Sequence, residues 1–350
     1  MVRLGKANLF SNARTLKKNF IKLQYTIQVL SLQTLFDMGI TTFLMLFFGL
    51  VLLITGGNIL LKSAVSLSLK FNIPKILIGM TVVSFATSAP ELIVSIKSAF
   101  LGSSDLAVSN VLGSNIANIG LVLGIIILIS PIQISKDIYK LNWPIMMLSA
   151  IMFYLFILDL KIERYEGLIL FSFLVISIFI LIKYQSNVQQ DFDLETGQID
   201  SLFKSISMLV FGGILLYLGS DWFVLAAIDI ANYFNVSQRI IGISVVSVGT
   251  SIPELATSLV ALINKEKNIS IGNLIGSNIF NVFAVLGITS MLIPLYVIDV
   301  DLIEFDIYVM LFFAMVILPL IFFPKKHVLG RLEGIIIFGC YSFYIYSIVQ

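Results

Sequence analysis

Long apolar stretches alternate with short polar breaks along the chain after residue 38. Each stretch is close to the roughly 20 residues that a helix needs to cross a membrane. The pattern predicts an all-α polytopic membrane protein with ten transmembrane helices, five in each half of the chain. The predicted spans are 39–61, 73–100, 106–130, 141–158, 166–183, 205–228, 238–263, 269–293, 305–323 and 332–349.

Small polar residues interrupt the second and third spans near their middles. Residues 87–91 read TSAPE, and residues 113–118 read GSNIAN. A carboxylate such as Glu91 inside an apolar span is costly and usually functional. Pro90 has no N–H, so the carbonyl of Ala86 loses its helical partner. Carbonyl, hydroxyl, amide and carboxylate oxygens at one depth predict a site for a hard cation.

The stretch 79–124 occurs again at 242–287, with a constant shift of 163 residues and 19 identical pairs among 46 positions. Chance similarity between apolar segments gives matched Leu, Ile and Val, but not matched Glu, Pro, Asn and Gly. The first half has therefore been copied. Because each copy has an odd number of spans, the second copy enters the membrane from the opposite face. Inverted repeats of this kind place a binding site at their interface near the membrane midplane.

The paired motifs TSAPE with GSNIAN and TSIPE with GSNIFN resemble the two α-repeats of the calcium/cation antiporter superfamily. The resemblance is greatest to its sodium/calcium exchanger branch, in the prokaryotic form, and covers residues 39–350. Two positions depart from the family pattern. Ala86 stands where Gly is usual, and Asn281 stands where several members have Asp. The resemblance implies Na⁺/Ca²⁺ antiport by alternating access, with the first and sixth helices sliding past the core.

Two carboxylates, one in each repeat, are the leading candidate ligands. Together Glu91 and Glu254 would neutralise one Ca²⁺ or two monovalent ions. The next predicted ligands are two threonines, the carbonyls around two serines and two amides: Thr87, Thr250, Ser84, Ser247, Asn118 and Asn281. The resemblance implies that four further serines hold Na⁺: Ser88, Ser251, Ser114 and Ser277. The alternative for the serines and asparagines is that they only form hydrogen bonds between helices.

Composition supports a membrane protein, because 58% of residues are hydrophobic and 12% are charged. A soluble domain needs roughly twice that charged fraction. The net charge of +2 gives no sign of nucleic-acid binding. Cys340 is the only cysteine, and the chain has no phosphate loop or nucleophile elbow. We therefore expect no enzyme activity and no cofactor. The expected partners are Ca²⁺ and Na⁺ as substrates and the lipid bilayer, and a single chain should suffice.

The chain divides into a basic N-terminal tail (1–38), a first repeat (39–183), a linker (184–204) and a second repeat (205–350). Lys and Arg in the loops set the orientation. If the first helix starts outside, the inner loops hold twelve of these residues and the outer loops four. The tail adds six on the outer side, so the assignment treats it as atypical. We expect an integral cell-membrane protein with a cytoplasmic linker.

A H⁺/Ca²⁺ exchanger of the same fold is the main alternative function, with the glutamate pair carrying protons. The serines retained in both repeats favour Na⁺, because a proton needs no cage of oxygen atoms. A channel is less expected, since a continuous pore usually forms from rings of subunits.

Overall fold

The computed structural model describes residues 39–185, 200–234 and 247–349. Within these ranges, seven helical runs are long and apolar enough to cross a membrane. An eighth candidate is a bent pair, Lys75–Thr87 and Ala89–Phe100, whose two parts differ in direction by 42°. The seven are Ile40–Phe71, Ser104–Ile129, Ile138–Ile157, Arg164–Tyr184, Leu202–Ile230, Lys267–Leu292 and Leu302–Phe322. The all-helical membrane architecture is therefore confirmed.

The two remaining predicted spans are also helical where they are described. The seventh, 238–263, begins outside the described residues, and its later part forms α12 (Ser247–Thr250) and α13 (Ile252–Ile263). The tenth forms α17 (Arg331–Val349). The tail 1–38 and most of the linker lie outside the described residues.

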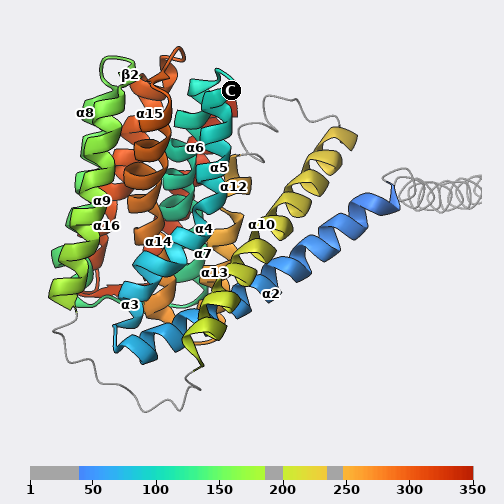
Figure 1. Ribbon diagram of the computed structural model, residues 1–350, viewed down its shortest axis with the longest axis vertical. Coiled ribbons are helices and arrows are strands. Elements are labelled where there is room, and N and C mark those ends of the chain that lie inside the picture. Colours follow the sequence, from blue (N-terminus) through green and yellow to red (C-terminus); the bar gives the residue numbers. More distant parts are fainter. Residues whose placement is uncertain (1–38, 186–199, 235–246, 350) are drawn as a thin grey trace, which may run out of the picture.

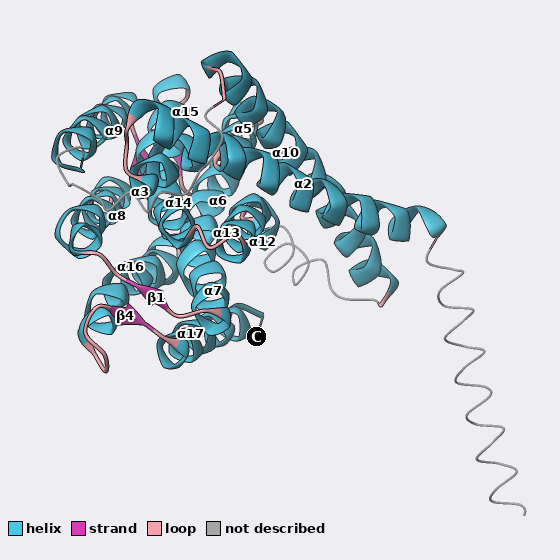
Figure 2. Ribbon diagram, turned by 90° about the horizontal axis from the view of Figure 1, so that it is seen from below, coloured by secondary structure: helices cyan, strands magenta, loops and turns pink. Residues whose placement is uncertain are grey.

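Helices α2 (Ile40–Phe71) and α10 (Leu202–Tyr233) lie side by side and cross the rest of the bundle obliquely (Figures 1 and 2). Their backbones touch at glycines. A Cβ atom on Gly56 would lie 2.9 Å from the Gly212 carbonyl oxygen, and one on Gly49 would lie 3.0 Å from that of Gly219. Small residues allow this close approach of membrane helices. The two contacts are equivalent under the 163-residue shift, so the repeats meet symmetrically here.

The other helices form an upright bundle beside this pair (Figure 1). Its centre consists of two runs related by the repeat. The first run comprises α6 (Ser104–Ala117), η2 (Asn118–Leu123) and α7 (Gly124–Ile129). The second comprises α14 (Lys267–Phe280), η5 (Asn281–Leu286) and α15 (Gly287–Leu292). The remaining helical elements are α3 (Lys75–Ile78), η1 (Gly79–Val83), α4 (Ser84–Thr87), α5 (Ala89–Phe100), η3 (Ile138–Asn142), α8 (Trp143–Ile157), α9 (Arg164–Gln185), η6 (Leu302–Asp306) and α16 (Ile307–Phe322).

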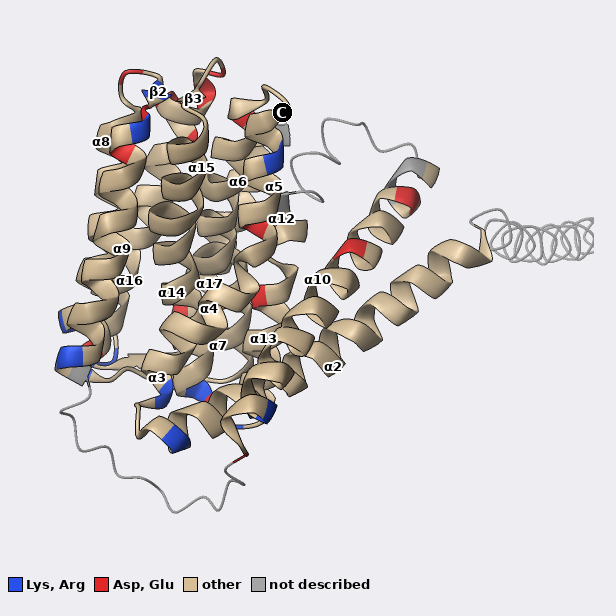
Figure 3. Ribbon diagram, viewed as in Figure 1, with Lys and Arg blue, Asp and Glu red and all other residues tan. Residues whose placement is uncertain are grey.

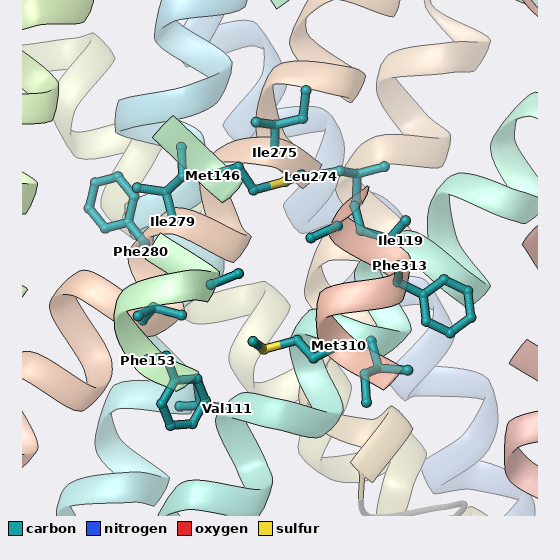
Figure 4. Packing of buried hydrophobic residues seen from close by; sticks show 14 of the residues in the cluster. Val111, Ile119, Met146, Phe153, Leu274, Ile275, Ile279, Phe280, Met310 and Phe313 are labelled. Carbon is teal, nitrogen blue, oxygen red and sulfur yellow. The ribbon is translucent and has the colours of Figure 1, made fainter. Parts of the chain in front are cut away.

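Apolar side chains from both repeats interlock at the centre of this bundle. Figure 4 shows Met146 and Phe153 of α8 in the same cluster as Met310 and Phe313 of α16, with Ile275 of α14 close by. All five are buried. Large apolar side chains are also exposed on the outer faces of the helices, which suits contact with lipid rather than water.

Two short antiparallel sheets tie the repeats together at opposite ends of the bundle. Strand β1 (Ile132–Gln133) pairs with β4 (Val328–Leu329), and β2 (Lys161–Ile162) pairs with β3 (Leu295–Tyr296). Each pair takes one strand from each repeat. Because β1 corresponds to β3 under the 163-residue shift, the two sheets are symmetry mates. This exchange at opposite ends is what an inverted repeat requires.

Candidate cation site

The two carboxylates lie just after equivalent helix breaks. Helix α4 ends before Ser88, whose φ and ψ are −87° and 4°, and Ser251 has −87° and 3° in the second repeat. In each copy a proline then lies in the first turn of the next helix, where its missing N–H costs nothing. The glutamate that follows, Glu91 or Glu254, is 0% exposed. A carboxylate in the first turn of a helix is favoured by the helix dipole.

The carboxylates have more buried oxygen atoms than protein donors. The hydroxyls of Ser88 and Ser277 each donate to Glu254 Oε1 at 3.3 Å. Among the described residues, Glu254 Oε2 and both carboxylate oxygens of Glu91 have no hydrogen-bond donor. Buried polar atoms nearly always have partners. A bound cation would supply the missing partner for these three oxygens.

Two hydroxyl pairs join the repeats beside the carboxylates. Thr87 Oγ1 lies 3.3 Å from Ser277 Oγ, and Ser114 Oγ lies 3.0 Å from Thr250 Oγ1. These pairs are related by the 163-residue shift. The Ser251 hydroxyl is buried without a partner among the described residues. Predicted hydroxyl ligands from all four motifs are thus brought together at the repeat interface.

Four asparagines form a closed set of hydrogen bonds between the two central runs. Asn115 Nδ2 donates to the Asn278 carbonyl at 3.3 Å, and Asn278 Nδ2 donates to the Asn115 carbonyl at 3.4 Å. Asn118 Nδ2 donates to Asn278 Oδ1, and Asn281 Nδ2 donates to Asn115 Oδ1, both at 3.1 Å. The Oδ1 atoms of Asn118 and Asn281 are buried and have no donor among the described residues. Their amide nitrogens are already used, so the oxygens are the atoms left for a cation.

The helices change local geometry at the same two asparagines. Helix α6 gives way to π-helical turns at Asn118, and α14 does so at Asn281. Such turns are rare and frequently occur at functional sites. They turn the two amides into the interface, where the oxygen atoms described above lie.

Ser84 and Ser247 differ from the other predicted site serines. The Ser84 hydroxyl donates toward the Gly79 carbonyl at 2.8 Å and the Asn273 carbonyl at 2.9 Å, so it packs α4 against α14. Its carbonyl accepts from the Ser88 N–H at 2.9 Å, at the helix break. Ser247 begins α12, and its side chain lies outside the described residues.

Sequence reasoning missed a second ring of polar residues around the site. Asn110 Nδ2 donates to Ser95 Oγ at 3.0 Å, and Asn273 Nδ2 donates to Ser258 Oγ at 3.1 Å. Asn273 Oδ1 also lies 3.2 Å from Thr87 Oγ1 and so holds that hydroxyl in place. The Asn and the Ser of each pair are the same residue types in both repeats, so an alignment of the repeats at a shift of 163 residues would have identified these pairs.

This arrangement presents buried oxygen atoms of three kinds, from carboxylates, hydroxyls and amides. Among the described residues, no group of three or more His, Cys, Asp or Glu side chains is placed to hold a metal ion. The site therefore has two negative charges and several neutral oxygens. Ca²⁺ takes six to eight oxygen ligands in flexible geometry, and such a set suits it.

Comparison with known proteins agrees with this geometry. A family model described as sodium/calcium exchanger protein matches residues 41–183 and 204–350. The putative antiporter CaxA of Alkalimonas amylolytica is 35% identical over 305 residues, covering 85% of this chain and 95% of the relative. The sodium/calcium exchanger MaX1 of Methanosarcina acetivorans is 31% identical over 339 residues, covering 85% of this chain and 96% of the relative.

A solved structure gives the same answer for the fold. The sodium-calcium exchanger NCX_Mj, soaked with Na⁺ and Ca²⁺, superposes with a TM-score of 0.74 at 28% identity, covering 88% of this chain and 98% of that one. The two matched repeats, the shared fold and the oxygen-lined interface lead to one conclusion: this chain is an integral membrane transporter, not an enzyme, and belongs to the sodium/calcium exchanger family.

Proposed function

We propose that this protein exchanges Na⁺ for Ca²⁺ by alternating access at the site between Glu91 and Glu254. The observation that carries the proposal is the pair of fully buried carboxylates, one from each repeat, with three oxygens that have no donor among the described residues. One Ca²⁺ would neutralise both charges. Na⁺ ions would do the same, with the neighbouring hydroxyl and amide oxygens completing their shells.

The charges of the two carboxylates explain why transport should be a strict exchange of one ion for the other. Two carboxylates without compensation repel each other in a poorly solvated site and are costly to bury. Either ion removes that cost, and the site then crosses the membrane neutral. An empty site would have to move two uncompensated charges. The protein should therefore change its access state with ions bound and not without them.

Helices α2 and α10 are the parts we expect to move. They lie against one side of the bundle, and their mutual contact runs along the glycine faces (Figure 1). The central runs α6–α7 and α14–α15, by contrast, are fastened by the reciprocal asparagine bonds. Sliding the α2–α10 pair along this fixed core would expose the site to one side of the membrane at a time.

The direct test is Ca²⁺ uptake into vesicles that contain the purified protein. An outward Na⁺ gradient should drive uptake, and an ionophore that dissipates the Na⁺ gradient should stop it. An outward proton gradient without Na⁺ should drive none. The Glu254→Gln variant serves as the transport-deficient control. Uptake driven by the proton gradient alone would instead identify a H⁺/Ca²⁺ exchanger of the same fold.

A further inference from the structure

A cavity of about 520 Å³ opens between the end of α7 and the start of α17, and none of its lining residues belongs to the cation site. It lies at the end of the bundle where α9 finishes and α10 starts, beside the β1–β4 sheet that Figure 2 shows from below. The lining residues are Pro131, Pro324, Lys325, Val328, Gly330, Arg331, Leu332 and Glu333. The volume lies within the range typical of ligand sites.

The cavity presents positive charge. The side chains of Lys325 and Arg331 are exposed, and neither forms an ion pair with a carboxylate of the described residues. Glu333 also lines the cavity, but it is 3% exposed and its Oε2 accepts the Gly330 N–H at 2.8 Å. Lys267 adds a third cation at the rim, because its Nζ donates to the Pro131 carbonyl at 2.8 Å. An anion entering here meets cations first.

The inverted repeat provides an internal comparison. Residues 157–167 at the opposite end correspond to 324–334, at a shift of 167 because the second copy is four residues longer before this point, and both copies share an Arg, a Glu and a Gly in the motif R-x-E-G. The backbone also agrees, since Leu160 and His327 have φ of 65° and 63°. The charges differ. Leu158 and Asp159 stand where the other copy has Lys325 and Lys326. The basic character therefore belongs to one end and not to the shared fold.

Apolar surface continues from the cavity along α17. Leu332 is 53% exposed and Ile335, one turn later, is 60% exposed, while Phe323 beside the cavity is 75% exposed. A soluble anion gains nothing from such a surface, whereas an amphiphile with acyl chains does. We propose that this cavity binds the head group of an anionic phospholipid, with the phosphate between Lys325 and Arg331 and the acyl chains along α17. Basic pockets between transmembrane helices are known to hold such head groups.

The test is lipid binding by the full-length protein, measured by native mass spectrometry while phosphatidylglycerol is titrated into detergent micelles. The double variant Lys325→Gln/Arg331→Gln should lose about fivefold in affinity per removed charge, or roughly 25-fold in total. The charge-preserving variant Lys325→Arg/Arg331→Lys should bind within about twofold of the unmodified protein. The matched control is Lys161→Gln/Arg164→Gln at the opposite end, which also removes two charges and should leave binding unchanged.

Three outcomes would overturn the proposal. Equal binding by Lys325→Gln/Arg331→Gln would show that the lipid sits elsewhere. An equal loss in the Lys161→Gln/Arg164→Gln control would show that total charge matters and this cavity does not. Competition by soluble glycerol phosphate as strong as by the lipid would identify a free phosphate as the ligand. Titration with phosphatidylcholine fixes the baseline, because it has the same acyl chains and no net charge.

Discussion

At the scale of single residues, the site combines two costly charges with many neutral oxygens. Glu91 and Glu254 are buried completely, yet only one of their four oxygens has a protein donor among the described residues. Both glutamates, with the helix break just before each of them, could be predicted because a carboxylate after T-S-x-P in an apolar span has few structural explanations. Their hydrogen-bond partners could not be predicted, since the packing of the helices against each other, and not the residue spacing within one helix, decides which side chains meet.

We predict that Glu91→Gln and Glu254→Gln each lower Ca²⁺ transport by at least about 100-fold, because removing one partner of a buried charge set costs about 3–5 kcal/mol. Gln keeps the shape of Glu and removes a buried charge, so thermal unfolding should not shift downward. The measurement is Na⁺-driven Ca²⁺ uptake in vesicles. Glu304→Gln, at an exposed carboxylate, is the control and should transport normally. Stable Glu91 or Glu254 variants with undiminished flux would remove these residues from the site.

Asn281 leads to a prediction about potassium. With two carboxylates, Ca²⁺ makes the site neutral, and an added K⁺ would leave a net positive charge in low dielectric. Exchange should therefore proceed at an unchanged rate when K⁺ on both sides is replaced by an inert cation. Asn281→Asp should make exchange sensitive to K⁺ or to pH, because the new carboxylate would titrate together with the glutamates. An absolute need for K⁺ in the unmodified protein would contradict this reading.

The structure also indicates how much stability Asn281→Asp should lose. Asn281 Nδ2 donates to Asn115 Oδ1 at 3.1 Å, and an aspartate has no such donor. Leaving a buried acceptor unpaired costs about 1–3 kcal/mol. Asn118→Asp breaks the equivalent bond to Asn278 and also places a carboxylate at the site, so it should lose the same stability and become sensitive to K⁺ or pH in the same way. An unchanged ion dependence in both folded variants would contradict the assignment of the two amide oxygens to the site.

At the scale of elements, the apolar pattern predicted the positions of the helices better than their lengths. Helix α2 runs over Ile40–Phe71, although the predicted span ends at residue 61. Its 32 residues are about 48 Å long, which exceeds the roughly 30 Å hydrocarbon core of a membrane. Lys62 and Lys70 ended the apolar run, but a helix can continue past the membrane surface. The break at Ser88, in contrast, follows from Pro90 and was foreseeable.

The glycine contact between α2 and α10 gives a prediction for Gly56. A Cβ atom there would lie 2.9 Å from both the Gly212 carbonyl oxygen and the Leu216 nitrogen. We expect Gly56→Ala to destabilise the protein by about 1–3 kcal/mol, because two backbones must separate. Gly339, in α17, is the control, because nothing in the described part of the chain outside its own helix lies within 4 Å of such an atom. Gly339→Ala should be neutral or stabilising by up to about 1 kcal/mol. Equal thermal unfolding of the two variants in detergent would contradict a tight crossing.

At the scale of the whole molecule, the inverted repeat was readable from sequence because matched Glu, Pro, Asn and Gly survive at one constant shift. The structure adds the contacts that the symmetry implies, such as the reciprocal bonds of Asn115 and Asn278 at 3.3 and 3.4 Å. The charged residues are also distributed unequally between the two ends of the bundle. Lys and Arg gather at the end of the bundle where α10 begins, and Asp and Glu are more frequent toward the other end (Figure 3). A sequence of one half alone would have shown neither feature.

That asymmetry predicts the orientation in the membrane, with the first helix starting outside and the linker end in the cytoplasm. In a Cys340→Ala background, Ile298→Cys (82% exposed) should react with an impermeant maleimide added to intact cells. Lys204→Cys, with a side chain 58% exposed, should react only after the cells are opened.

Deleting residues 1–37 should change neither result nor Ca²⁺ transport, because the family match begins at residue 41. The six basic residues of the tail favour the opposite orientation, so its removal should strengthen the bias that the inner loops set. Labelling of Lys204→Cys from outside would reverse the orientation, and loss of transport in the properly inserted truncation would make the tail part of the mechanism.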